Sequence, residues 1–370
     1  MAKPLRVVQW ATGNCGERAL REVIRDPRFE LVGVLTYSTE KEGVDAGALC
    51  GEADTGIQAT MDKEKIFSLQ ADCVVYVPRA SGVGPMRAGA SIEEVVGEAV
   101  RFVEAGTNMV TTLGDFFDGG HERIGEEARR RIEDACERTS ATIFAGGGDP
   151  GWFTEMLPLP FLANARRIDH IELEEFGDLS RRPSPHMLFE QMQFGRSVEA
   201  YDASSRKAKL YNNYLPTIRV TAKLAGLKID EWRCDWDVAT ARIDCNPVAG
   251  PIKAGQTAAQ RLVITGHTEG QEKIRFIQYG YMTRDLVPAW DLGPLGWRIR
   301  LQGDTPLFID VPWQLDGSEI GRYVPSFNTN HLINAIPYLR NAPSGMVTFA
   351  ELPIILPNGP YGKLRSVDEA

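Results

Sequence analysis

The sequence lacks the features of a membrane-spanning or nucleic-acid-binding protein. It has no run of about 18 apolar residues, so we expect no segment that crosses a bilayer as a helix. The formal net charge of its 370 residues is −9, which disfavours binding to nucleic acid or to an anionic membrane surface. Hydrophobic residues make up 43% and charged residues 25%, which is typical of a globular protein with a sizeable core.

Metal-binding and disulfide spacings are also missing. The six cysteines, at positions 15, 50, 73, 136, 234 and 245, form no Cys-x-x-Cys pair, and the five histidines form no His-x-x-x-His pair. We therefore expect free thiols, most of them buried, in a reducing compartment, and no metal site. Residues 1–6 lead directly into a strand-like run without the apolar stretch of a signal peptide, so a cytoplasmic location is expected.

Short apolar runs alternate with amphipathic stretches over residues 1–148. The pattern predicts strands at 6–10, 29–35, 72–77, 108–112 and 141–145, and helices at 17–25, 91–104 and 122–139. Ser91 followed by Glu94 is a capping box, which marks a helix start. Strands separated by helices form parallel βαβ units. We predict an α/β fold, a doubly wound Rossmann domain with its ligand site beyond the C-terminal ends of the strands.

The pattern changes after the glycine-rich junction at residues 146–151. Longer strands that alternate apolar and polar residues are predicted at 168–176, 231–239 and 274–279, with helices near 185–195 and 213–225. This alternation favours a mainly antiparallel sheet with one solvated or ligand-facing side. We therefore predict a second α+β domain over residues 149–325 for substrate binding and dimerisation, and a C-terminal segment over 326–370.

A dinucleotide fingerprint lies between the first predicted strand and helix. Residues 11–16, called the fingerprint loop below, match Gly-x-Gly-x-x-Gly at the second and third glycines, Gly13 and Gly16, with Ala11 at the first. The second glycine lets the backbone approach a pyrophosphate, and the third lets helix and strand pack closely. We predict cofactor contacts from Gly13, Asn14, Cys15 and Gly16; a merely structural tight turn is the alternative.

Cofactor choice depends on the residues after the second strand. An NAD enzyme usually has an Asp or Glu there that binds the ribose 2′-hydroxyl. Here Ser38, Thr39 and Lys41 are better suited to the 2′-phosphate of NADP, which we favour. Glu40 and Glu42 keep NAD possible, and a solvated loop that selects neither cofactor is a further alternative.

Two further loops are expected at the nicotinamide end. Arg79 follows the strand at 72–77, and Thr112 and Leu113 follow the strand at 108–112. Because the carboxyl ends of parallel strands share one edge of the sheet, these residues are candidate cofactor contacts. Arg79 can equally be a surface charge.

Several of these segments together resemble a known group of enzymes. The fingerprint loop, the strand at 108–112, the junction at 146–151 and the Asn-Ala-Ile-Pro at 334–337 resemble the dihydrodipicolinate-reductase-like superfamily. Within it, the chain is most similar to 2,4-diaminopentanoate dehydrogenase and the native NAD(P)-dependent amine dehydrogenases. The resemblance implies a homodimer, a small-molecule ketone or amine substrate, and reversible reductive amination with NAD(P)H. It also implies that the C-terminal segment returns to the Rossmann domain, where Asn334 can reach the cofactor.

The chain departs from this group at two places. It has no adjacent histidines, which argues against the dihydrodipicolinate reductase reaction. The resemblance to the amine dehydrogenases implies an amine-binding Glu just after the strand at 108–112, and Gly114 or Asp115 occupies its place here. Asp115 is the first candidate catalytic carboxylate and Asp149 the second; a loop-turn or capping role is the alternative for each.

The sequence thus predicts an NAD(P)-dependent oxidoreductase. Amine dehydrogenation, the reverse of ketone amination, is the expected reaction. Two alternatives stay open because of the change at residues 114 and 115. The first is reduction or oxidation of another carbonyl or alcohol substrate, and the second is a non-catalytic dinucleotide-binding protein.

Overall fold

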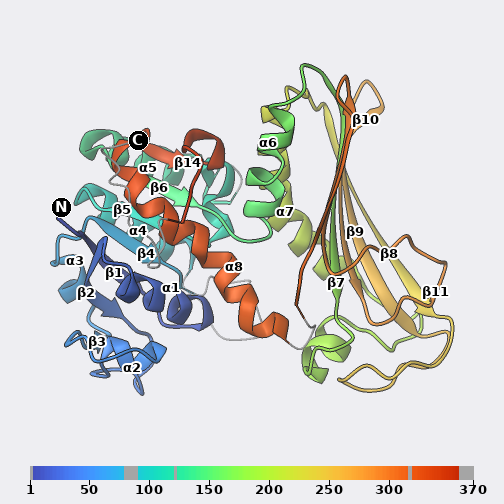
Figure 1. Cartoon of the computed structure of the whole chain (residues 1–370), viewed down its shortest axis with the longest axis horizontal. Coiled ribbons are helices and arrows are strands. Elements are labelled where there is room, and N and C mark those ends of the chain that lie inside the picture. Colours follow the sequence, from blue (N-terminus) through green and yellow to red (C-terminus); the bar gives the residue numbers. More distant parts are fainter. Residues whose placement is uncertain (1–2, 79–90, 121–122, 316–318, 358–370) are drawn as a thin grey trace. The chain divides into compact units, whose positions relative to one another are not determined.

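The computed structural model describes residues 3–78, 91–120, 123–315 and 319–357. The chain forms two compact units (Figure 1). Unit 1 consists of Met1–Trp152 with Tyr323–Ala370, and unit 2 of Phe153–Arg322. The predicted Arg79 lies outside the described residues.

Unit 1 is built on a seven-stranded sheet in which every pair of neighbouring strands is parallel. In spatial order the strands are β14 (Gly345–Val347), β6 (Thr142–Ala145), β5 (Asn108–Thr111), β4 (Cys73–Tyr76), β1 (Leu5–Trp10), β2 (Phe29–Leu35) and β3 (Ala59–Thr60). The central strands are short buried apolar runs, as expected for a parallel sheet covered on both faces. The edge strand β14 comes from the C-terminal segment and pairs with β6.

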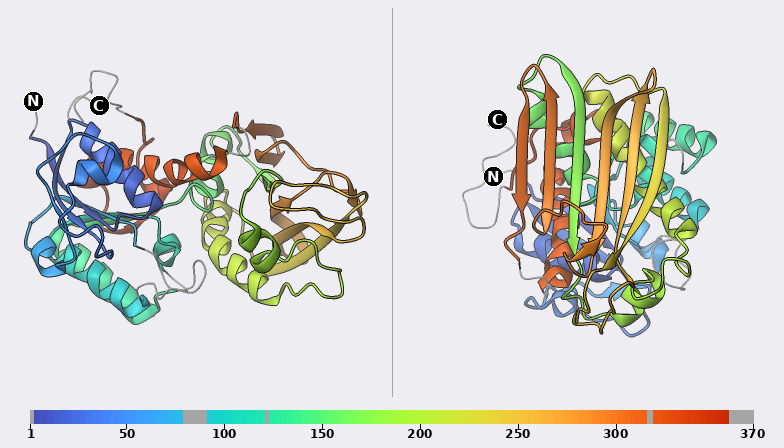
Figure 2. Two further views of the ribbon diagram at one scale, coloured as in Figure 1. Left: turned by 90° about the horizontal axis from the view of Figure 1, so that it is seen from below. Right: turned by 90° about the vertical axis from the view of Figure 1, so that its right-hand side faces the viewer.

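Helices lie on both faces of this sheet (Figure 2, left). The helices of unit 1 are α1 (Asn14–Arg25), α2 (Ala46–Cys50), α3 (Lys63–Phe67), η1 (Gly114–Gly120), α4 (Ile92–Glu104), α5 (Glu126–Thr139), α8 (Ile320–Ala335), η5 (Ile336–Asn341) and η6 (Phe349–Glu351). One apolar cluster packs α4 and α5 onto the sheet, and a separate cluster packs α1 and α2. Ser91 and Glu94 form both hydrogen bonds of the capping box predicted for α4.

Unit 2 holds a second seven-stranded sheet. In spatial order its strands are β11 (Leu286–Val287), β8 (Glu231–Ala241), β9 (Thr257–Thr268), β10 (Gln271–Tyr281), β7 (Ile168–Asp178), β12 (Gly296–Gly303) and β13 (Leu307–Pro312). Only the β10–β7 pair among these neighbours is parallel. The helices of unit 2 are η2 (Trp152–Met156), α6 (Leu159–Leu162), η3 (His186–Gln191) and α7 (Ser204–Leu224).

The two faces of the unit 2 sheet differ in character. Helix α7 packs on one face, where the ring of Tyr214 lies 4.6 Å from that of Phe276 and its hydroxyl donates to Glu175. The opposite face carries charged side chains, and Figure 2, right, shows its strands in front of the helices. Adjacent residues of a strand point to opposite faces, so Glu174 lies on the charged face and Glu175 on the helix-covered one.

The predicted fold class is confirmed, both for the doubly wound parallel sheet and for the mainly antiparallel second sheet. Most predicted strands agree with the observed ones to within two residues at each end, although β10 begins three residues earlier. Two helices begin earlier than predicted. Helix α1 begins at Asn14 instead of residue 17, and α7 begins at Ser204 instead of residue 213. Their first turns are polar and show no apolar periodicity, so the sequence pattern missed them.

Candidate cofactor and catalytic site

The fingerprint loop joins β1 to α1 in the middle of the unit 1 sheet. Gly13 is the residue that precedes the first helical turn, and no side chain caps this helix end. The first N–H groups of an α-helix have no partner within the helix, and they carry the positive end of its dipole. This helix start therefore has the free N–H groups and the polarity that a pyrophosphate site needs.

The two fingerprint glycines serve different purposes. A Cβ atom on Gly16 would lie 2.1 Å from the carbonyl oxygen of Ala11, so the fold itself requires glycine there. A Cβ atom on Gly13 would meet nothing within 4 Å, and the φ of Gly13 is −74°, which any residue adopts. The fold does not require glycine at 13, whereas close approach of a pyrophosphate does. The residues of this loop therefore fit a dinucleotide.

Ala11 replaces the first glycine of the fingerprint, and its backbone keeps the glycine-like conformation. Its φ is +77°, a left-handed value that costs a residue with a Cβ about 1–2 kcal/mol. The buried side chain of Gln9 donates to the carbonyl oxygen of Ala11 at 2.8 Å. This bond fixes the loop in the conformation that the fingerprint requires.

The loop after β2 contacts the fingerprint loop directly. Lys41 Nζ donates to the carbonyl oxygen of Thr12 at 2.6 Å, and the hydroxyls of Thr12 and Thr36 lie 3.2 Å apart. Ser38 donates its backbone N–H to the Thr36 hydroxyl. The structure thus brings the predicted Lys41 and Ser38 to the fingerprint loop, while Thr39 is exposed beside them.

The side chain of Glu42 is directed away from the fingerprint loop and toward β3. Its carboxylate accepts hydrogen bonds from the Thr60 hydroxyl and the Met61 backbone N–H, beside β3. The sequence treated Glu42 as a candidate for the ribose 2′-hydroxyl. These bonds instead give it a structural role between the β2 loop and β3.

Tyr37 is a candidate site residue that the sequence reasoning missed. It directly follows β2, its side chain is 48% exposed, and its hydroxyl accepts a hydrogen bond from Trp10 Nε1 at 2.8 Å. Trp10 is fully buried in β1, so this bond fixes the orientation of an exposed aromatic ring directly after β2, where the ribose of a dinucleotide is expected. Burial, the larger cause, and nearby Glu98 raise the pKa of Tyr37 above its ordinary value. The sequence signal that could have identified Tyr37 is an aromatic residue directly after the second predicted strand.

The candidate catalytic loop follows β5. Leu113 donates its backbone N–H to the Thr111 hydroxyl, and Asp115 lies two residues further on in η1. The carboxylate of Asp115 is buried and its Oδ1 lies 3.0 Å from Arg123 Nε. The predicted Thr112 and Leu113 are at the carboxyl end of the strand, and Asp115 is an ion-paired carboxylate.

The glycine junction after β6 is held by helix α8. Asn328 Oδ1 accepts a hydrogen bond from the backbone N–H of Gly148 at 2.9 Å. The buried ring of His331 lies against Gly146, where a Cβ atom would come within 2.9 Å of Nε2. Asn334, the predicted contact in this helix, is half-buried one turn further on. Asp149 lies within the junction itself, before Pro150.

The described part of the chain carries neither a membrane-spanning helix nor a metal cluster. No helix there is long and apolar enough to cross a membrane. No group of three or more His, Cys, Asp or Glu side chains among these residues is arranged to hold a metal ion. All six cysteines are free thiols.

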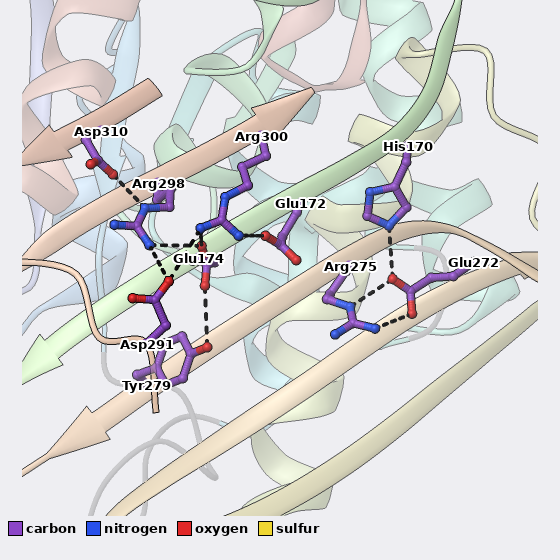
Figure 3. Close-up of polar contacts among 10 residues, drawn as sticks. All are labelled: His170, Glu172, Glu174, Glu272, Arg275, Tyr279, Asp291, Arg298, Arg300 and Asp310. Atoms are coloured by element: carbon purple, nitrogen blue, oxygen red, sulfur yellow. Dashed lines mark hydrogen bonds and ion pairs between the residues drawn. The ribbon is translucent and has the colours of Figure 1, made fainter. Parts of the chain in front are cut away.

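Unit 2 carries a network of ion pairs on its charged sheet face (Figure 3). The guanidinium groups of Arg298 and Arg300 lie 3.7 Å and 3.6 Å from Glu174, whose residue surface is only 3% exposed. Arg300 also pairs with Glu172 at 2.5 Å, and Arg298 with Asp310 at 2.7 Å. Burial and Glu172 raise the pKa of Glu174, and the two arginines oppose this rise. We call residues 172, 174, 298, 300 and 310 the charged face.

The fold and the fingerprint loop together are those of a two-domain NAD(P)-dependent oxidoreductase of the Rossmann type. No protein-family model matches the chain. An amine dehydrogenase from Streptomyces virginiae is 26% identical to it over 98% of this chain and 100% of its own length.

Solved structures show the same fold. An amine dehydrogenase from Mycobacterium smegmatis superimposes with a TM-score of 0.70 at 17% identity, over 97% of this chain and 98% of that one. A putative NADPH-dependent oxidoreductase from Desulfitobacterium hafniense has a TM-score of 0.50 at 10% identity, over 92% of this chain and 88% of that one.

Proposed function

We propose that this protein is an NAD(P)-dependent amine dehydrogenase that interconverts a ketone plus ammonia and the corresponding amine. The observation that carries the dinucleotide part of the proposal is Gly13, a glycine that the fold does not need and a dinucleotide does. The similarity to the Streptomyces virginiae amine dehydrogenase covers 98% of this chain and all of that protein, which favours amine chemistry over other reactions of this class.

The chain's own residues bind and orient the reactants. A bound nicotinamide dinucleotide supplies or accepts the hydride. The start of α1 holds the pyrophosphate, and the loop after β5 lies at the carboxyl ends of the strands, where the nicotinamide end is expected. We assign Thr112, Leu113 and Asn334 to cofactor contacts there; Arg79, proposed from the sequence alone, lies outside the described residues.

Asp115 is the proposed partner of the substrate nitrogen. A carboxylate stabilises a cationic amine or iminium and can exchange a proton with it. Arg123 engages Oδ1, so we assign Oδ2 to the substrate. Asp149 is the second candidate because it lies in the junction held by α8.

Ammonium dependence tests the reaction. The purified full chain would be incubated with NADPH and a panel of small ketones, with and without ammonium, and NADPH consumption followed by its absorbance. The proposal expects consumption with at least one ketone only when ammonium is present, and the amine as product by mass spectrometry. Equal rates with and without ammonium would assign the protein to carbonyl reduction instead.

Carbonyl reduction is the second candidate function. The observation that favours it is the Asp115–Arg123 ion pair, because an arginine beside the site can polarise a neutral carbonyl oxygen. A non-catalytic role as a dinucleotide-binding protein requires saturable cofactor binding with no turnover on any substrate of the panel.

We propose NADP as the preferred cofactor. Ser38, Thr39 and Lys41 follow β2, and the side-chain nitrogen of Lys41 lies beside the fingerprint loop. Glu42 is engaged with Thr60 and Met61 and so does not compete for the ribose. Titration of the full chain with NADPH and NADH, followed by fluorescence, tests this preference. Tighter binding of NADH would refute it.

We propose that unit 2 also forms a homodimer through the charged face. Its rows of Glu and Arg carry both signs of charge, so the same face of a second copy turned by a two-fold axis offers complementary partners. Phe308 lies between Arg298 and Arg300 and is 58% exposed, which provides an apolar contact in the middle of this charge.

Sedimentation of the wild type and of Phe308→Glu tests the homodimer. The wild type is expected as a dimer, and Phe308→Glu as a monomer that still binds the dinucleotide. Ile243→Glu, an exposed residue in a loop of the same unit, is the control and should stay dimeric. A monomeric wild type would refute the proposal.

We assign residues 1–148 to cofactor binding, 149–325 to substrate binding and dimerisation, and 326–370 to a segment that returns to the cofactor domain. The β14–β6 pair supports the last assignment. Six free thiols support a reducing, cytoplasmic location. Fluorescence microscopy of the tagged chain checks the location.

A further inference from the structure

We propose that the adenine base of the dinucleotide stacks on the aromatic ring of Tyr37, so that the protein recognises the face of the base and not its edge. This inference rests on the proposed dinucleotide binding and extends it to the base. Of the residues after β2, the sequence assigned cofactor contacts only to Ser38, Thr39 and Lys41.

Tyr37 lies where the adenosine part of a dinucleotide is expected. It lies just beyond β2, and the preceding residue, Thr36, holds its hydroxyl 3.2 Å from that of Thr12 in the fingerprint loop. In a Rossmann domain the pyrophosphate lies at the start of the first helix, and the adenosine ribose lies at the end of the second strand. We therefore expect the base joined to that ribose within reach of the Tyr37 side chain.

The ring of Tyr37 is fixed although it is exposed to solvent. Its hydroxyl accepts the indole N–H of Trp10 at 2.8 Å, while 48% of the residue surface is exposed. Trp10 itself is buried among three aromatic rings, those of Phe67, Tyr76 and Phe102. An exposed ring on a rigid support loses little freedom when a ligand stacks on it, which is the property of a preorganised binding surface.

A lysine covers one face of this ring. Lys63 Nζ lies over the Tyr37 ring, 5.6 Å from its centroid, and forms an ion pair with Glu98 at 2.5 Å. Glu98 is only 7% exposed and also accepts the hydroxyl of the buried Tyr76 at 2.5 Å, so the ion pair is anchored in the core. Because Glu98 balances the charge of Lys63, this lysine supports the ring and is not a free cation for a phosphate. The base then stacks on the other face of the ring.

Stacking has a consequence for cofactor recognition. A base that stacks on an aromatic side chain gains about 5- to 150-fold in affinity, and the gain depends little on which base is bound, because every base has a π-face. Hydrogen bonds to the edge of the base would instead distinguish a donor amino group from an acceptor oxygen. Reduced nicotinamide hypoxanthine dinucleotide phosphate carries an oxygen in place of the adenine amino group of NADPH. The wild type should bind this analogue within about threefold as tightly as NADPH.

The experiment titrates the full chain and three variants with NADPH and with adenosine 2′,5′-bisphosphate, the adenylate half of NADP. Tyr37→Ala should raise both Kd values by the same factor, about tenfold or more, because both ligands carry the base. Tyr37→Phe keeps the ring and loses only the hydroxyl, so both Kd values should stay within about threefold of the wild type. Ile354→Ala removes a residue that is 75% exposed in the same unit, and this control should change neither value.

Three results would overturn the inference alone. An unchanged Kd in Tyr37→Ala would show that the base lies elsewhere. Equal losses in Tyr37→Phe and Tyr37→Ala would show that the hydrogen bond to Trp10 holds the loop and that the ring binds nothing. Binding of the hypoxanthine analogue more than about tenfold weaker than that of NADPH would show that the edge of the base is recognised. A wild type that binds no dinucleotide would overturn the proposed function, and this inference with it.

Discussion

The two fingerprint glycines allow a paired test of the cofactor site, because the structure predicts opposite outcomes for the same substitution. At position 13 an added Cβ atom meets no neighbour within 4 Å. Alanine is a poorer residue than glycine before a helix, by a few tenths of a kcal/mol to about 1. Alanine also restricts the unfolded chain, which stabilises the protein by about 0.4–1 kcal/mol. The two effects nearly cancel, so Gly13→Ala should leave the free energy of unfolding unchanged within about 0.5 kcal/mol.

At position 16 the added Cβ atom lies 2.1 Å from the Ala11 carbonyl oxygen and 2.9 Å from its carbonyl carbon. These are backbone atoms, so the start of α1 must move away from the loop to relieve the overlap. Such overpacking costs about 1–3 kcal/mol, more than the gain of about 1 kcal/mol from the helix propensity of alanine. Gly16→Ala should therefore lower the free energy of unfolding, whereas Gly13→Ala should not.

Cofactor affinity gives the second half of the test. The Cβ atom on residue 13 occupies the space through which we expect the pyrophosphate to approach, so Gly13→Ala should raise the Kd for NADPH at least tenfold, or about 1.4 kcal/mol. Urea unfolding and fluorescence titration of both variants measure the two quantities. Wild-type affinity in Gly13→Ala would place the pyrophosphate elsewhere. Strong destabilisation of Gly13→Ala would show that the glycine serves the fold.

Three further predictions concern single side chains. Asp115→Asn should lower kcat for the amine reaction at least 100-fold with little change in the Kd for NADPH, whereas the exposed Asp54→Asn should change neither; steady-state kinetics checks this. Lys41→Ala should weaken NADPH more than NADH in paired titrations, and an equal loss for both would show that Lys41 only holds the loop. Burial lowers the pKa of His331 to about 4. Between about pH 6.5 and pH 4, His331 is therefore protonated in the unfolded chain and neutral in the folded one, so acid favours unfolding. The free energy of unfolding should fall by about 2–3 kcal/mol from pH 7 to pH 4.5, and urea unfolding of His331→Gln should lack this part of the pH dependence.

The sequence predicted the two sheets because their signals are local. A buried parallel strand such as β4 is a continuous apolar run, and an antiparallel strand such as β8 alternates, so each could be assigned from its own residues. The fingerprint was found for the same reason. It lies within a few residues of one strand and one helix, which is the context the motif requires.

The sequence did not predict the contacts between segments that are distant along the chain. Nothing local indicates that Asn328 reaches Gly148, or that Lys41 donates to Thr12, because these bonds depend on where the loops meet at the sheet edge. Asn334 was chosen for its motif, and the motif does not specify which face of α8 contacts the loops. The Asn-Ala-Ile-Pro segment ends α8, whereas Asn328, which accepts the hydrogen bond from Gly148, lies near its middle.

The pair of Asp115 and Arg123 is the point at which the two candidate chemistries separate. A cationic substrate nitrogen is attracted by a carboxylate, yet Arg123 already offsets that charge at 3.0 Å. Amine chemistry therefore requires that Asp115 serve both cations, one through each carboxylate oxygen. A neutral carbonyl substrate does not need Asp115 to serve two cations. Its oxygen needs a hydrogen-bond donor, and Arg123 supplies one. The arginine pairing of Asp115 thus affects the charge balance around the proposed reacting atom, and the ammonium dependence measures the result.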